Sequence, residues 1–97
     1  METTERETKY GLTFLVPSSL GFIKICSLES DTPFPPIHKG DIIDPRDWRG
    51  ASFEKYMKLF NYGDLLKADI IYHHIFKNED GSYGNHDIDI FTKVVKK

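Results

Sequence analysis

The densest group of side chains that could carry out chemistry is the stretch from Asp41 to Trp48, DIIDPRDW. Paired carboxylates can perform acid–base catalysis when a pocket raises the pKa of one of them. The alternative is a solvated turn that begins at Asp44-Pro45, with Trp48 packed at the end of a barrel. The sequence contains neither a glycine-rich phosphate loop nor a serine nucleophile elbow. We therefore predict no catalytic residues and a protein that is not an enzyme.

Histidine and cysteine supply the usual metal ligands and reactive thiols. His73 and His74 are neighbours in a predicted strand, so their rings point to opposite faces and cannot chelate one ion together. One of them could join His86 and Asp87 across a hairpin, but no zinc-type spacing accompanies them. We predict no metal site and no cofactor. The single cysteine, Cys26, is expected to be a buried thiol, and a chain without an intramolecular disulfide suits a reducing compartment.

Aromatic residues beside cations can bind the bases and phosphates of nucleic acids. In the segment SSLGFIKI, Phe22 and Lys24 lie two positions apart, so a strand places them on one face and Ile23 and Ile25 on the other. Stacking of a base on an aromatic ring contributes about 1 to 3 kcal/mol and tolerates any sequence. The alternative is that Phe22 packs beneath a helix or the proline-rich loop. The predicted nucleic-acid-binding residues are Phe14, Phe22, Lys24, Phe34 and His38.

A second candidate surface lies in the aromatic, proline-rich stretch from Phe34 to Trp48. Aromatic residues and arginine are the side chains that most often anchor protein interfaces. We therefore predict that a protein partner would contact Trp48 and the two arginines near it, Arg46 and Arg49.

The elements that would position these residues follow from hydrophobic alternation and from turn residues. Strands are predicted over residues 10–16 and 21–28, which form a first hairpin, and over residues 67–77 and 85–95, which form a second. In the strand over 21–28, Cys26 falls on the face of Phe22 and Lys24. In the last strand, Ile88, Ile90, Thr92 and Val94 share a face opposite Asp87, Asp89, Phe91 and Lys93.

The segment between the two hairpins contains most of the prolines. The stretches 34–38 (FPPIH) and 41–44 (DIID) could each form a short edge strand, the first only at an edge because proline cannot donate a ladder hydrogen bond. A helix is predicted from a capping Ser52 to about Asn61. Its apolar stripe consists of Phe53, Tyr56, Met57 and Phe60.

The chain of 97 residues predicts a flexible tail over residues 1–9 and a single domain over residues 10–97. Five strands, with one helix between the third and the fourth, predict a mainly β fold, a small five-stranded barrel of the OB type. An open antiparallel sheet with one packed helix is the alternative. Hydrophobic patterns do not separate the two.

Three short segments, Gly21-Phe22-Ile23, Ile37-His38 and Tyr62-Gly63-Asp64, together with Gly11 in the first strand, resemble motifs of the cold-shock domain family of OB-fold nucleic-acid binders. Leu20 stands where the family's second-strand motif carries another aromatic residue. Pro36 occupies the stacking position of its third-strand motif, and Phe34 lies two positions early. The resemblance implies binding of single-stranded RNA or DNA through an aromatic face, without catalysis.

Charge and composition limit the kinds of partner. The net charge is −2 and the basic residues are scattered, which argues against duplex binding through a broad basic face. Stacking on single strands does not need such a face. The polar start, METTERETK, resembles no signal peptide, and no apolar stretch approaches the length of a membrane span. We expect a cytoplasmic protein with no membrane contact.

Two hypotheses follow. The first is a small non-enzymatic domain that binds single-stranded nucleic acid, and the second is a protein-interaction module, such as a small inhibitor or accessory subunit encoded by a mobile element. An exposed cluster of Phe22, Lys24 and His38 would favour the first. A contiguous apolar patch around Trp48 would favour the second. The oligomeric state stays open.

Overall fold

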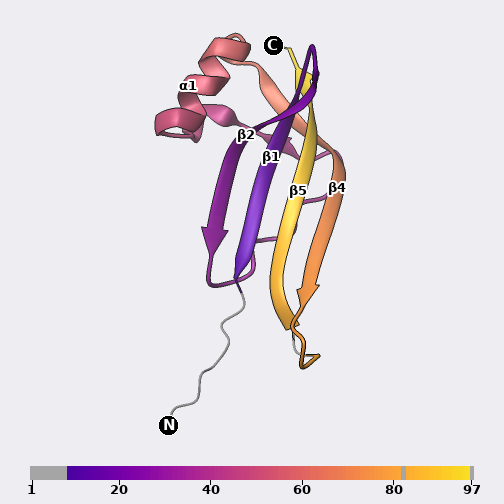
Figure 1. The fold of residues 1–97 in the computed structure, drawn as a ribbon. Coiled ribbons are helices and arrows are strands. Elements are labelled where there is room, and N and C mark those ends of the chain that lie inside the picture. Colours follow the sequence, from indigo (N-terminus) through magenta and orange to yellow (C-terminus); the bar gives the residue numbers. More distant parts are fainter. Residues whose placement is uncertain (1–8, 82, 97) are drawn as a thin grey trace.

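The computed structural model describes residues 9–81 and 83–96. Over these residues the fold is mainly β, with five strands and one α-helix (Figure 1). The elements are β1 (Tyr10–Ser18), β2 (Gly21–Ser30), β3 (Ile42–Ile43), the 3-10 turn η1 (Pro45–Asp47), α1 (Gly50–Leu59), β4 (Leu65–Lys77) and β5 (Tyr83–Val95). The predicted class is confirmed, including the position of the helix between the third and fourth strands.

The five strands form one sheet in the order β2-β1-β5-β4-β3. The hairpins β1–β2 and β4–β5 are antiparallel, and they are joined through the parallel central pair β1–β5. The sheet curls into a half-barrel (Figure 1), and β2 and β3 form its two edges. The architecture thus has the curvature of a barrel, while the parallel central pair distinguishes it from a purely antiparallel sheet.

The core lies on one face of the sheet, called here the inner face. Alternation along β1 buries Leu12, Phe14 and Val16 there, and Ile90 of β5 lies beside them. The irregular segment between β2 and α1 covers this face through Phe34, Ile37 and Trp48, which pack against the core. In the described part of the chain, no helix is long and apolar enough to cross a membrane.

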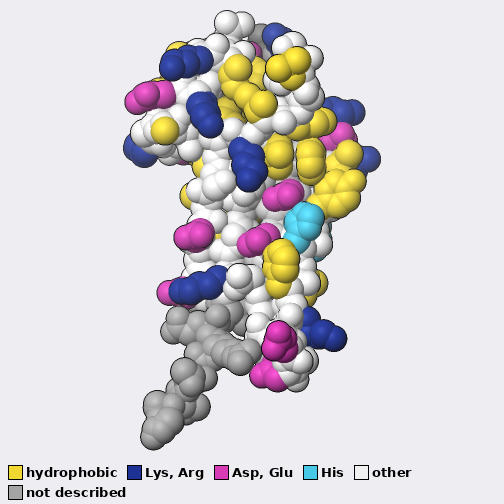
Figure 2. Space-filling view, viewed as in Figure 1, with side chains coloured by type: hydrophobic (Ala, Val, Ile, Leu, Met, Phe, Trp, Pro, Cys, Tyr) yellow, Lys and Arg dark blue, Asp and Glu magenta, His cyan; other side chains and the backbone are white. Residues whose placement is uncertain are grey.

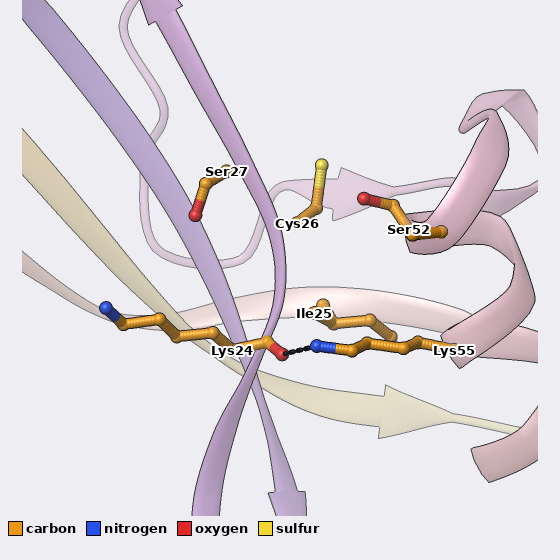
Figure 3. A pocket seen from close by; sticks show the side chains of 7 residues that line it. Lys24, Ile25, Cys26, Ser27, Ser52 and Lys55 are labelled. Carbon is orange, nitrogen blue, oxygen red and sulfur yellow. Dashed lines mark hydrogen bonds between the residues drawn. The ribbon is translucent and has the colours of Figure 1, made fainter.

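A bulge in β2 corrects the predicted face of Cys26. Phe14 is opposite Cys26, but Leu15 is opposite Lys24, so Ile25 is an extra residue in the strand. Ile25 and Cys26 are therefore both buried, and Figure 3 shows them beside α1 while Lys24 points the other way. The expected burial of the Cys26 thiol is confirmed, although strict alternation placed it beside Lys24.

Helix α1 lies against the edge of β2. A cleft of about 280 Å³ separates them, and Lys55 crosses it to donate a hydrogen bond to the carbonyl oxygen of Lys24 at 3.4 Å (Figure 3). The helix begins at Gly50 after Arg49, so Ser52 is not its cap, contrary to prediction. The buried Tyr56 hydroxyl accepts a hydrogen bond from the Gly63 amide at 2.9 Å and so fixes the turn into β4.

The proline-rich segment contains less strand than predicted. Residues 34–38 form no strand because two prolines remove the amides that a ladder would need. The predicted strand over residues 41–44 is reduced to Ile42 and Ile43, which pair with β4.

Candidate binding surface on the outer face of the sheet

Three aromatic rings cross the face of the sheet opposite the core, called here the outer face. The rings of Phe22 on β2 and Phe91 on β5 meet edge-to-face, with centroids 5.0 Å apart, and Tyr72 on β4 meets Phe91 at 5.5 Å. Phe22 is 49% exposed and Tyr72 is 52% exposed. We call Phe22, Phe91 and Tyr72 the aromatic strip. It leaves aromatic area from three strands in solvent.

Apolar neighbours widen the aromatic strip. Leu15 of β1 and Ile70 of β4 are both in register with Phe91, and Ile70 is exposed. Figure 2 shows hydrophobic side chains gathered in the upper part of this face, next to acidic side chains and a histidine. Contiguous exposed apolar surface of this kind usually marks an interaction site.

A polar hollow of about 460 Å³ lies on the same face. Its lining includes Thr13, Lys24, Glu29, His74, Asp87 and Asp89. His74 Nε2 lies 3.1 Å from Asp89 Oδ2, and a Cβ atom at Gly11 would lie only 2.5 Å from Asp87 Oδ1. Glycine at position 11 therefore leaves room for the Asp87 carboxylate over β1.

The charge of the polar hollow is predominantly negative. Three carboxylates, from Glu29, Asp87 and Asp89, line it together with the one lysine, Lys24. Like charges repel and a concave site concentrates its field, so this hollow favours a cationic group over a phosphate.

Phe22 and Lys24 are the predicted nucleic-acid residues that the structure places on this face. Phe14 is not available for stacking, because it is only 5% exposed and its ring contacts Trp48 on the inner face, with centroids 5.7 Å apart. Phe14 points inward because it alternates with Thr13 and Leu15 along β1.

Phe34 and His38 also lie away from Phe22 and Lys24. Both line a hollow of about 260 Å³ with Ile71 and His73, on the inner side of β4, and Phe34 packs against the core. The backbone amide of His38 donates to Asp41 Oδ2 at 2.8 Å. The five predicted residues therefore do not form one surface, because the loop that carries Phe34 and His38 covers the opposite face.

The predicted protein contacts around Trp48 are mostly engaged within the chain. Trp48 packs on Phe14, and Arg46 forms a two-pronged pair with Asp44, Nη2 to Oδ2 at 2.6 Å and Nε to Oδ1 at 2.8 Å. The hydrogen bonds and charge of Asp44 raise the pKa of Arg46 above its ordinary value. Arg49 donates to the carbonyl oxygen of Asp47 at 3.1 Å. These contacts brace the loop against the core and against its own backbone.

The histidines pair on opposite faces of the second hairpin. His73 Nδ1 lies 2.9 Å from His86 Nε2, whereas the neighbouring His74 lies on the outer face beside Asp89. The predicted divergence of His73 and His74 is thus seen in the structure. Among residues 9–81 and 83–96, no group of three or more His, Cys, Asp or Glu side chains could hold a metal ion.

Sequence reasoning did not include Phe91 and Tyr72 among the site residues. Alternation did place Phe91 opposite the apolar face of the last strand, which was a usable signal. Its convergence with Phe22 depends on the parallel pairing of β1 and β5, which joins residues far apart in the sequence.

Comparison of the chain with protein-family models, with curated proteins and with solved structures gives no match. A function must therefore be inferred from the geometry of the outer face.

Proposed function

We propose that this chain is a protein-binding module that uses the outer face of its sheet. The aromatic strip takes up an apolar side chain of the partner, and the polar hollow takes up a basic group beside it. The observation that carries this proposal is an exposed row of aromatic rings next to a hollow with three carboxylates.

Aromatic side chains provide large contact areas with few rotatable bonds, and they dominate the energetics of protein interfaces. The strip is braced by edge-to-face contacts between its own rings, so little side-chain freedom remains to be lost on binding. The carboxylates of Asp87 and Asp89 add a preference for lysine or arginine on the partner.

Site-specific photo-crosslinking in the native cell tests the proposal. Tyr72 is replaced by photoreactive benzoylphenylalanine, and the same replacement at the exposed Leu59 of α1 is the matched control. We expect position 72 to give a discrete adduct whose mass exceeds that of two copies of this chain, or that contains another protein, and position 59 to give none. Phe22→Ala in the same chain should reduce that adduct. The absence of a protein adduct at position 72, or equal adducts at both positions, would overturn the proposal.

Single-stranded nucleic acid on the same face is the second candidate. Phe22 and Lys24 support it, since an exposed ring and a cation lie on one face in the arrangement that a base and its phosphate need. The carboxylates around Lys24 oppose it, because they repel phosphate. In the crosslinking experiment, an adduct at position 72 that nuclease removes would favour this candidate over a protein partner.

A further inference from the structure

The edge of β4 that faces away from β5 is open along most of its length. β4 has 13 residues, whereas β3 pairs only with Leu66 and Lys67. Gly40 and Asp41 extend this contact to both backbone groups of Ala68. Beyond Ala68, no backbone hydrogen bond joins this edge to another segment in the described part of the chain.

The open segment lacks most of the features that normally prevent edge pairing, and its irregularities are confined to its two ends, between Ala68 and Ile70 and between Ile75 and Lys77. Residues 70–76 (IIYHHIF) contain no proline, no glycine and no aspartate, glutamate, lysine or arginine. Ile75 is 62% exposed, and Ile70, Tyr72 and Phe76 are also exposed. Natural edge strands are usually short, charged, bulged or covered, because an open apolar edge is a template for another strand.

The other edge of the sheet, formed by β2, is better protected than the edge of β4. Helix α1 lies against the edge of β2, and Lys55 donates a hydrogen bond to the carbonyl oxygen of Lys24 there. The edge of β2 is therefore partly blocked, whereas no backbone hydrogen bond covers the edge of β4 beyond Ala68 in the described chain.

We propose that β4 pairs with β4 of a second copy of this chain, antiparallel and centred on His73. In this register Ile71 is opposite Ile75, and Ile70 is opposite Phe76. The ends bring Asp69 of one copy, whose carboxylate lies 3.7 Å from Lys93 Nζ of its own chain, near Lys77 of the other, so each end places unlike charges together. A second copy fits because the segment complements itself.

The direction of the backbone groups agrees with this register. Ala68 directs its amide and carbonyl away from β5, toward the open edge. The register shift between Ala68 and Ile70 then places the amides and carbonyls of Ile71, His73 and Ile75 at this edge, up to the next shift between Ile75 and Lys77. Ile71, His73 and Ile75 then exchange hydrogen bonds with Ile75, His73 and Ile71 of the second copy. A two-fold axis perpendicular to the sheet joins the two sheets and puts both aromatic strips on one side.

Oligomeric state tests the pairing independently of the proposed function. Light scattering during size-exclusion chromatography should show the full chain at twice its 11.2 kDa mass. Ile75→Lys should weaken the dimer by roughly tenfold or more, because a charge in the open edge opposes pairing. Leu20→Lys, at a residue 96% exposed in the β1–β2 turn, is the matched control and should leave the dimer unchanged. Circular dichroism confirms that both variants fold.

Disulfide trapping tests the register. Residues opposite each other in a hydrogen-bonded antiparallel pair have Cα atoms about 5.5 Å apart, which a disulfide can span. Oxidised His73→Cys should therefore form a covalent dimer. Ile71→Cys should not, because its counterpart lies about four residues, or about 13 Å, along the strand. The wild type, with only the buried Cys26, controls for other crosslinks. A monomer at the highest concentration the chain reaches, a dimer that resists Ile75→Lys, or equal trapping of both cysteine variants would overturn the proposal.

Discussion

The two faces of the sheet use aromatic pairs in different ways. On the inner face, Phe14 and Trp48 lie 5.7 Å apart and Phe14 is 5% exposed. On the outer face, Phe22 and Phe91 lie 5.0 Å apart, and Phe22 is 49% exposed. The distances between the rings are comparable, so the difference in exposure comes from what covers the rings. Burial by the proline-rich loop makes one pair a core, and the lack of such a cover leaves the other pair accessible to a partner.

The charges follow the same division. The inner face carries the apolar cluster of Leu12, Val16 and Ile90, while the outer face places Lys24 and Asp89 in a polar hollow. A charged group buried without a partner would cost several kcal/mol, so these residues belong on a face that stays hydrated until a partner binds. The contrast predicts that substitutions on the inner face change stability and that substitutions on the outer face change binding.

The largest effect is expected from truncating Phe14 on the inner face, with Phe22 on the outer face as the comparison. Phe14→Ala should lower the free energy of unfolding by about 3 to 5 kcal/mol, because it removes a buried ring and leaves a cavity beside Trp48. Phe22→Ala should cost about 1 kcal/mol, mainly the edge-to-face contact with Phe91. Urea denaturation followed by Trp48 fluorescence measures both. Equal losses of stability in the two variants would contradict the division of the faces.

Local sequence patterns predicted much of what distinguishes the two faces. The two hairpins and the shared outer face of Phe22 and Lys24 follow from alternation, and the burial of Cys26 follows from its residue type alone. The bulge at Ile25 was not predictable in that way, because an extra residue in one strand is defined only by its pairing with the next.

The composition of the candidate site depended on tertiary contacts that no local pattern encodes. Phe34 and His38 belong to an irregular segment whose path over the inner face is set by packing, so their expected place beside Phe22 was wrong. Phe91 reaches Phe22 only through the parallel pairing of β1 with β5. Residue types thus indicated an aromatic surface, and the sheet order decided which aromatics share it.

An intermediate effect is expected at the hydroxyl that joins α1 to the sheet. Tyr56→Phe should lower the free energy of unfolding by about 1 to 3 kcal/mol, because the buried Gly63 amide loses its acceptor. Tyr62→Phe is the matched control, since that side chain is 63% exposed, and its cost should be within about 0.5 kcal/mol. Thermal unfolding of the two variants gives the comparison. No difference between them would mean that the hydroxyl does not secure this turn.

The smallest effect on stability, and the sharpest test of the outer face, is expected at a carboxylate of the polar hollow. Asp87→Asn keeps the side-chain shape and should change the free energy of unfolding by less than about 0.5 kcal/mol. It removes a negative charge close to Lys24, so a short labelled oligonucleotide at low salt should bind about twofold or more tightly, measured by fluorescence anisotropy.

Asp47→Asn, in the loop that covers the inner face, carries the same change in net charge and should leave oligonucleotide binding unaltered. Added salt should remove the gain from Asp87→Asn, because screening shortens the reach of exposed charges. Equal gains from both variants would mean that net charge, and not the polar hollow, governs the approach of phosphate. A gain confined to Asp87→Asn would show that the outer face itself excludes phosphate, as a surface suited to basic side chains must.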